Sequence, residues 1–503
     1  MANEIELKLA FPAEALDAIR SHPLIVHAPR KGEPRVLDNT YFDTPELTLH
    51  AARIAIRTRR MGNTVLQTVK CAAESVGGLS SRPEWEQPFN KAFDFSAVDI
   101  KPVRKMLQGL SAQLVPVFTT VFHRETRIVQ PVPEVCILVM IDTGKIIANG
   151  RETTICEVEL ELAQGGADDL QNFAITLAQD LPLIPFDLSK AQRGYQLFCM
   201  EEIKPTRFGK TPVQMGWTPL QAFRAIAMQA ESGWLANLHG ALASNDPEFI
   251  HQFRVALRRL KSLIKACKPI LPADFIKRWS ETFSMLTDVS GATRDLDVLR
   301  ETILQPMLCS ESESAIEPLM RRSLKECEQT RESAKAALTR LPHGVILLTF
   351  NRELHRLNET TPCKALPAFA RKQLNRLHAR ARRRLDAVLQ NPSSAMVHRL
   401  RIAFKNLRYN NEFFAPLFAE SANNNFNKTL SELQDELGFL HDLDVALKQV
   451  DAWAIDDPEL HEARLHIEQW HAERAAKAMS RICTGARALL AEHTPWQKTP
   501  KPA

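Results

Sequence analysis

The hydrophobic pattern changes its period once, near residue 200, and this change constrains the fold more than any other feature of the 503-residue chain. Before it, short segments such as Glu4 to Leu9 alternate charged and apolar residues, which is typical of β-strands. After Thr218-Pro219, a typical helix start, apolar residues recur at helical spacing almost to the end. The change predicts an α+β chain in which strands and helices lie in separate domains.

We therefore expect a strand-rich domain at 1–200, a linker without periodicity at 201–217, a helical domain at 218–490 and a polar tail at 491–503. The first domain is predicted to be a mostly antiparallel sheet of about eight strands with a few helices, and a closed barrel is one way to satisfy the edges of such a sheet.

The helical domain contains an internal repeat. A motif that begins at His251 recurs 147 residues later, at His398, and a second motif that begins at Gly291 recurs at the same separation. A constant separation over two motifs indicates the duplication of one helical unit, whose two copies pack together. We place the two halves at about 218–365 and 366–490.

Each copy of the first motif carries a basic stripe, because its cationic residues are spaced by three and four and so share one helix face. The stripes consist of His251, Arg254, Arg258 and Lys261 in one copy, and of His398, Arg401, Lys405 and Arg408 in the other. One such stripe is explained by a solvated face, but two copies in register favour an anionic chain as partner. Protonation of the histidines near their ordinary pKa of about 6.5 should then tighten binding as the pH falls.

Further charges surround these stripes. The block from Arg371 to Arg408 holds eleven Lys or Arg residues and a single acid, Asp386. Such blocks indicate a polyanion, which is nucleic acid, an anionic membrane or polyphosphate. The second motif adds four acids that we expect to orient the basic side chains rather than bind metal: Asp295, Asp297, Asp442 and Asp444.

In the strand-rich domain, charged residues occupy one face of several predicted strands. Glu157, Glu159 and Glu161 repeat the alternation of the first strand, and Arg57 and Arg59 share a face of another. Carboxylates on neighbouring strands repel each other unless cations lie between them. Acids and bases in about equal measure therefore predict a barrel with a charged inside and an apolar outside covered by helices.

This mixture of charges suits phosphate chemistry. Arg and Lys clamp phosphate oxygens, and clustered glutamates hold Mg²⁺ or Mn²⁺. A metal that bridges phosphates spreads charge in phosphoryl transfer. The chain has no Walker A sequence, no GxSxG elbow and no HExxH helix, so it is not expected to be a P-loop enzyme.

At these positions the sequence resembles two known families. Residues 1–200 resemble the CYTH superfamily, the triphosphate tunnel metalloenzymes, and 218–490 resemble the CHAD domain, a histidine-rich helical module that binds polyphosphate. The order CYTH then CHAD is similar to that of bacterial inorganic triphosphatases. The first resemblance rests on Glu4-x-Glu6-x-Lys8, Tyr41-Phe-Asp43-Thr, Arg57-x-Arg59, Lys70, Arg82-Pro-Glu84, Arg124, Asp142, Glu157-Val-Glu159-Leu-Glu161 and Ser189-Lys190-x-x-Arg193-Gly194-Tyr195.

The resemblance implies an eight-stranded antiparallel β tunnel that hydrolyses inorganic tripolyphosphate to pyrophosphate and phosphate with Mg²⁺ or Mn²⁺, and a helical domain of two repeated halves that binds long-chain polyphosphate. It implies catalytic roles for Glu4, Glu6, Lys8, Lys70 and Arg193. It implies phosphate contacts from Lys8, Arg57, Arg59, Lys70, Arg82, Arg124, Lys190 and Arg193. It implies metal ligands among Glu4, Glu6, Asp142, Glu157, Glu159 and Glu161, without deciding among the last three.

Other functions fit the same residues. Thiamine triphosphatase and class IV adenylate cyclase share this fold, and a non-catalytic polyphosphate-binding scaffold is an answer of another class. A nucleic-acid partner is disfavoured because aromatic residues do not alternate with the basic ones.

The expected location is the cytoplasm, in association with polyphosphate granules and not with a membrane. No apolar run approaches the roughly 20 residues of a membrane span. The charged first strand leaves no room for a signal peptide, and nine cysteines without a CxxC pair favour reduced thiols.

Overall fold

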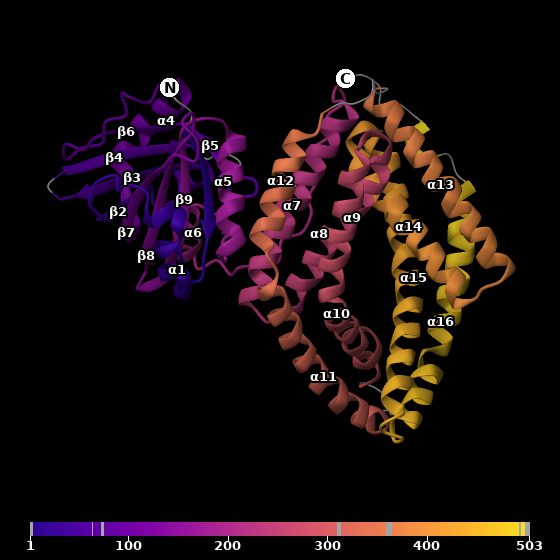
Figure 1. Ribbon diagram of the computed structural model, residues 1–503. Helices are drawn as coiled ribbons and strands as arrows, with labels where there is room; N and C mark the ends of the chain where they lie inside the picture. The colour runs from indigo at the N-terminus through magenta and orange to yellow at the C-terminus, as the bar shows by residue number, and fades with distance from the viewer. Residues whose placement is uncertain are drawn as a thin grey trace. The chain divides into compact units, whose positions relative to one another are not determined.

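The computed structural model (Figure 1) describes residues 4–62, 64–71, 75–308, 313–358, 365–491 and 494–497, with the side chains of residues 4, 81, 82 and 313–315 outside this description. The chain forms two compact units. The first comprises residues 1–204 together with 342–355, and the second comprises 205–341 together with 356–503. Among the described residues, no helix combines the length and the apolar character that a membrane crossing requires.

The first unit is built on one antiparallel sheet with the strand order β10-β1-β9-β8-β7-β2-β3-β4-β6, and β5 also pairs with β1. The chain passes directly from β5, which pairs with β1, to β6, which pairs with β4, so the sheet curls back on itself. The strands are β1 (Glu4–Ala10), β2 (Arg35–Asp43), β3 (Ile54–Met61), β4 (Thr64–Cys71), β5 (Leu79–Arg82), β6 (Glu84–Pro88), β7 (Val115–Val129), β8 (Cys136–Ala148), β9 (Arg151–Gln164) and β10 (Ile184–Pro185).

The curled antiparallel sheet confirms the predicted fold class of the first domain. Its described part has ten strands rather than eight, because a proline separates β5 from β6 and because β10 is only two residues long. The helices of this unit are α1 (Leu16–Ser21), α2 (Pro23–Val26), α3 (Thr48–Ala51), α4 (Lys101–Leu110), α5 (Ala167–Asp180), α6 (Lys190–Phe198) and α12 (His343–Arg356).

Helices cover the outer face of the sheet. Leu7 and Leu9 of β1 are fully buried in a core cluster that also contains Phe173 and Leu177 of α5. Since side chains alternate along a strand, the charged residues of β1 point to the other face, the inside of the curl.

One helix of the first unit comes from far along the chain. Leu348 of α12 belongs to the same core cluster as α5, and Gln171 donates a 2.7 Å hydrogen bond to Asn351. A Cβ atom at Gly344 would lie 1.8 Å from the carbonyl oxygen of Leu183, so only glycine allows this approach. The segment between the two repeats therefore packs as part of the strand-rich unit.

The second unit is helical and repeats with the predicted separation. The helices α7, α8 and α9 begin 147 residues before α13, α14 and α15, at Pro219, Pro247 and Ala273. The helices are α7 (Pro219–Ala243), α8 (Pro247–Cys267), α9 (Ala273–Val289), α10 (Gly291–Val298), α11 (Glu313–Arg340), α13 (Leu366–Gln390), α14 (Ser394–Phe414), α15 (Glu420–Ala454) and α16 (Leu460–Ala491). In this unit α8 packs against α14, so the two copies of the motif helix are neighbours.

Candidate active site and anion-binding surface

The charged face of β1 is buried inside the curl. Glu6 and Lys8 are each only 5% exposed, although they alternate with the core residues on the outer face. In the register of β1 with β9, Glu6 lies opposite Glu161 and Lys8 lies opposite Glu159. Directly opposed residues on neighbouring strands interact, so this face is an enclosed polar surface and not a solvated one.

Three buried carboxylates gather on the same face. Asp142, Glu157 and Glu159 each offer an oxygen atom, and these atoms all lie within 4.8 Å of one another. Lys190, the first residue of α6, pairs with all three; its Nζ lies 2.7 Å from Asp142 Oδ2 and 2.9 Å from Glu159 Oε1. Arg124 forms a bidentate pair with Asp142 at 2.7 and 2.6 Å and also contacts Glu159.

The ion pairs control the protonation of this acidic cluster. Burial alone would raise the pKa of Glu159, but Lys190 and Arg124 outweigh it and hold that pKa well below its usual value. Burial likewise opposes the charge of Lys190, and the carboxylates around it, Asp142 first, raise its pKa instead. Glu159 is therefore ionised and Lys190 is protonated at neutral pH.

A group of cations lies on neighbouring strands. Arg57 and Arg59 project from β3; Arg59 donates a 2.9 Å hydrogen bond to Asn39, and Arg57 donates one of 3.4 Å to Tyr41. Burial, followed by repulsion from Arg57 and Arg124, lowers the pKa of Arg59 to about 10. The guanidinium groups are thus close enough to repel one another, which is the arrangement that a bound anion would relieve.

Acids on β6 offset part of this charge. Glu84 pairs with Lys70 and lies 3.6 Å from Arg57, while the pair of Arg59 with Glu86 is looser, at 4.0 Å.

The remaining predicted site residues have different surroundings. Lys8 donates to the carbonyl oxygen of Leu188 at 3.4 Å, just before α6. Arg193 is on α6, where its guanidinium donates to the carbonyl of Thr154 and burial lowers its pKa. The side chains of Glu4 and Arg82 lie outside the described residues, although their backbones pair with each other between β1 and β5.

The acidic cluster fits a hard metal ion. Its donors are all carboxylate oxygens, which Mg²⁺, Mn²⁺ and Ca²⁺ prefer. Three carboxylates against the two cations Lys190 and Arg124 leave a formal net charge of minus one. Among the ion pairs of the described residues, Glu157 Oε1 contacts only Lys190, and Glu157 Oε2 is buried without a hydrogen bond.

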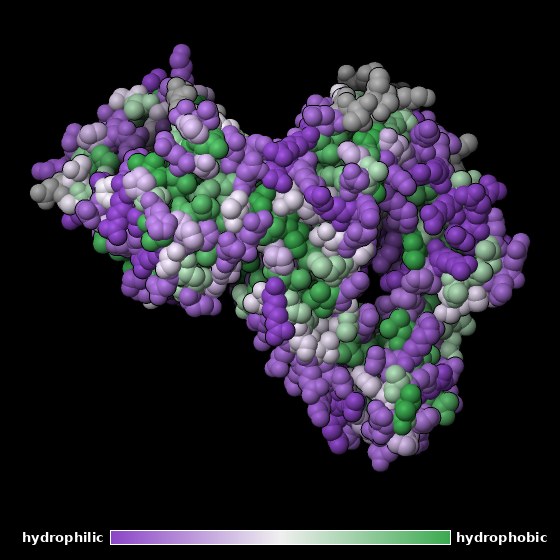
Figure 2. Space-filling view, in the orientation of Figure 1, coloured by the Kyte–Doolittle hydropathy of each residue, from purple (hydrophilic) through white to green (hydrophobic). Residues whose placement is uncertain are grey.

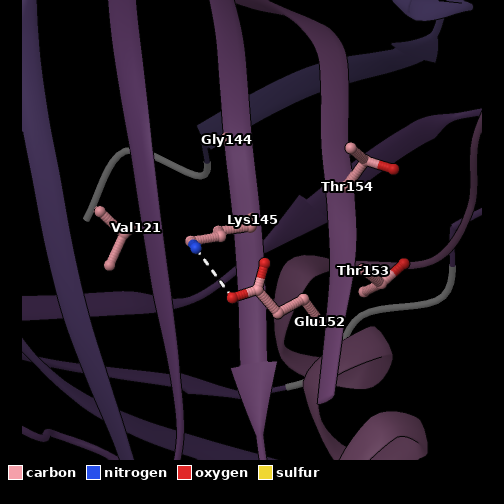
Figure 3. Close-up of a pocket in the computed structure, with 6 residues that line it drawn as sticks. All are labelled: Val121, Gly144, Lys145, Glu152, Thr153 and Thr154. Carbon is pink, nitrogen blue, oxygen red and sulfur yellow. Dashed lines mark hydrogen bonds and ion pairs between the residues drawn. The ribbon is translucent and has the colours of Figure 1, made fainter. Parts of the chain in front are cut away.

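A separate hollow lies on the outer face of the sheet. It has a volume of about 630 Å³, and Lys145 donates a 2.8 Å hydrogen bond to Glu152 across it. Because Lys145 is three residues from Asp142 on β8, the two side chains point to opposite faces. Figure 3 shows its lining, which consists of Val121, Gly144, Lys145, Glu152, Thr153 and Thr154.

In the second unit, the two basic stripes face each other. Burial first, and then repulsion from Arg258 of α8 and Arg401 of α14, lowers the pKa of Lys405 to about 6. Residues of both halves thus repel each other across the α8–α14 contact. Lys261 donates to Ser284 at 2.8 Å and Arg408 to Ser431 at 3.4 Å, so the last stripe residues have equivalent partners in the two copies.

The histidines of the stripes do not have ordinary pKa values. Burial, followed by Arg294 and Arg258, lowers the pKa of His251 to about 4. Burial also lowers the pKa of His398, whose Nδ1 lies 3.2 Å from Nδ1 of His441. The expectation that these histidines titrate near pH 6.5 was wrong, because neighbouring cations and desolvation disfavour their charged form.

The four aspartates of the second motif divide into two groups. Asp442 lies 3.8 Å from Arg401 of the stripe. Asp297 pairs instead with Arg331 at 2.8 Å, and Asp444 pairs with Lys448 at 2.7 Å. The burial of Asp295 raises its pKa despite the nearby Arg254.

Two positions of this surface were not predicted as binding residues. Arg294 and His441 occupy the same place in the two repeats and border His251 and His398. The repeat itself was the signal that could have found them. In the first unit Asn39 was also missed, and nothing in its sequence context marks it as the partner of Arg59.

Comparisons with known proteins agree with the two-part architecture. Residues 2–195 match the CYTH domain, and residues 225–451 match the CHAD domain. An inorganic triphosphatase of Haemophilus influenzae is 32% identical over 201 residues, which are 39% of this chain and 55% of that protein. The chain thus matches about half the length of this curated relative.

Solved structures resemble each part. The crystal structure of the CHAD domain from the plant Ricinus communis is 27% identical, with a TM-score of 0.50, and covers 57% of this chain and 97% of its own. A putative adenylyl cyclase from Hippeastrum, described as having a dominant triphosphatase activity, is 16% identical with a TM-score of 0.30, and covers 38% of this chain and 95% of its own.

Proposed function

Because the chain joins a CYTH domain to a CHAD domain, we propose that it is a metal-dependent triphosphatase that hydrolyses inorganic tripolyphosphate to pyrophosphate and phosphate, with a helical domain that binds long-chain polyphosphate. The observation that carries the proposal is the inner face of the curled sheet. There the acidic cluster of Asp142, Glu157 and Glu159 lies beside cations that repel one another.

The cations would hold the substrate. Arg57 and Arg59 project from one strand and Lys70 from the next, and a linear triphosphate offers oxygens along its whole length. Arg124 contacts the acidic cluster and lies near enough to Arg59 to repel its guanidinium group. It would therefore lie where the terminal phosphate meets the acids.

The acids would bind the metal and accept the proton of the attacking water. A divalent cation held by Asp142, Glu157 and Glu159, with Glu6 and Glu161 beside them, would spread the charge of phosphoryl transfer. In the reaction a water oxygen bonds to the terminal phosphorus, and the bridging oxygen leaves with pyrophosphate. The water proton passes to a carboxylate of this face, for which Glu6 is the first candidate because it is buried on the inner face and accepts from Ser80 at 3.1 Å.

The test is phosphate release from tripolyphosphate, thiamine triphosphate, ATP and pyrophosphate, each with Mg²⁺ and with Mn²⁺. Tripolyphosphate should be the best substrate, and Glu6→Gln should lower its rate at least about a hundredfold. Glu152→Gln on the outer face is the matched control and should leave the rate unchanged. Faster turnover of thiamine triphosphate, cyclic AMP formation from ATP, or an active Glu6→Gln enzyme would contradict the proposal.

Polyphosphate binding is tested separately. Neutralising Arg254, Arg258, Arg401 and Lys405 together should abolish binding of long polyphosphate while tripolyphosphate hydrolysis survives. Affinity should also fall steeply with salt, because each cationic contact releases counterions. Equal competition by duplex DNA of matched charge would make the surface a generic polyanion binder.

A further inference from the structure

A second basic surface runs along α13, apart from the two facing stripes. We call it the α13 ridge; its residues follow each other at helical spacing and include Arg376 and Arg380. The ridge has five cationic residues, of which Lys372, Arg376 and Arg383 are exposed. The only acid on this helix is Asp386. The hydrophilic surface over this helix is visible in Figure 2. The ridge consists of Lys372, Arg376, Arg380, Arg383 and Arg384.

The ridge is long and uncompensated. At 1.5 Å per residue it extends over about 18 Å. Within the part of the chain that the structure describes, no carboxylate forms an ion pair with Arg376 or Arg380. Exposed like charges repel each other, so the ridge costs stability unless an anion lies on it.

The duplicated helix provides an internal comparison. The equivalent of α13 in the first half is α7, and the positions that match the ridge there carry no charge: Ala225, Gln229, Gly233, Ala236 and Asn237. The repeated fold therefore does not require cations at this place.

On α7 the same face holds an extended segment of the chain. Asn237 donates to the carbonyl of Thr206 at 3.0 Å and accepts from its N–H at 2.9 Å. One turn before Asn237, a Cβ atom at Gly233 would lie 2.8 Å from the ring of Phe208. One turn earlier again, Gln229 donates a 2.9 Å hydrogen bond to the carbonyl oxygen of Lys210. Residues 206–210 thus follow the helix along the positions that are cationic on α13.

The ridge adjoins the stripe of α8. Lys265 lies one turn beyond Lys261, the last stripe residue. Burial first, and then Arg380 and Arg376, lowers the pKa of Lys265, which places its ammonium group near the ridge. Positive charge therefore continues from α8 onto α13.

We propose that the α13 ridge is a second track for an extended linear polyanion, on which a long polyphosphate chain lies as residues 206–210 lie on α7. This inference rests on the proposed polyphosphate binding and adds to it a preference for long chains. Guanidinium forks suit phosphate oxygens, and the ridge has no aromatic residue on which a nucleic-acid base could stack.

The test compares two charge-matched double variants of the full chain. R376Q/R380Q removes two ridge charges, while R382Q/K277Q removes one exposed charge from another face of α13 and one from α9. The first variant should bind long polyphosphate at least about tenfold more weakly, because two linked sites reinforce each other. Its log–log salt dependence should become shallower by about 1.5. Short polyphosphate, which the facing stripes hold alone, should bind equally well to both variants.

The outcomes separate the two proposals. Unchanged long-chain affinity in R376Q/R380Q would refute the ridge while wild-type binding upholds the polyphosphate function. A wild-type chain that binds neither length would overturn both. A loss confined to single-stranded RNA, with polyphosphate unaffected, would show that the ridge serves another polymer and would refute the proposed occupant.

Discussion

Replacing Lys190 by Met should destabilise the first unit strongly, because three buried acids depend on it. Its side chain is 7% exposed and pairs with Asp142, Glu157 and Glu159. Arg124 pairs with two of these acids, Asp142 and Glu159. Removing one partner of a buried ion pair typically costs about 3–5 kcal/mol, because the remaining charge is buried without compensation.

A matched control exists on the other face of the same sheet. Lys145 pairs with Glu152 at 2.8 Å, but the two side chains are 47% and 53% exposed. Lys145→Met should therefore cost only about 0–1 kcal/mol. The difference between the two variants isolates the effect of burial.

The penalty should depend on pH. In the native protein the pKa of Glu159 lies below its unfolded value, so its pairing stabilises the fold above a pH of about 4.3 and is lost as the pH falls through the folded pKa. Without Lys190, burial is expected to raise the pKa of this carboxyl. The variant would then be destabilised at neutral pH, and the difference from the native protein should shrink as acid protonates Glu159.

The measurements are thermal unfolding and amide hydrogen exchange of β8 and β9, with a chelator and with added MgCl₂. A loss of about 3–5 kcal/mol should lower the melting temperature of the unit by about 6–20 °C. Mg²⁺ should restore part of it, because a ligand that binds only the folded state stabilises that state. If Lys190→Met in chelator at neutral pH is no less stable than Lys145→Met, the buried ion pairs of Lys190 do not contribute as described.

Three further predictions concern the binding surfaces and the packing. Arg57→Ala should raise KM for tripolyphosphate as well as lower kcat in steady-state kinetics, because the guanidinium binds ground and transition states; an effect on kcat alone would contradict shared binding. A bound polyanion should raise the pKa of Lys405 from about 6, so polyphosphate affinity should increase as the pH falls from about 8 to 6. Lys405→Gln should flatten this pH profile of binding. The pKa of His251 is about 4, so His251 should not contribute in this range. Leu348→Ala in α12 should destabilise the first unit by about 2–5 kcal/mol and speed hydrogen exchange in α5; unchanged exchange would show that this helix is dispensable.

The sequence alone determined the features that depend on local spacing. Alternation placed Glu6 and Lys8 on one face of β1, and the structure confirms that Leu7 and Leu9 fill the core on the other. The separation of 147 residues predicted the duplicated helices, and the helix starts repeat with that separation. Both follow because the direction of a side chain within one element is set by the period of that element.

Only the tertiary structure decided which charges meet. Asp142 and Lys190 are 48 residues apart, and no spacing rule shows that they form a buried pair or that Arg124 joins them. Residues 342–355, which contain most of α12, belong to the strand-rich unit although they lie between helices of the second unit in the sequence. No change of composition at these residues predicts that packing. The pKa of Lys405, likewise, depends on its burial between two helices that are distant in sequence. Strand register, burial and long-range contacts set these properties, because the free energy of a charge depends on what surrounds it and not on its neighbours along the chain.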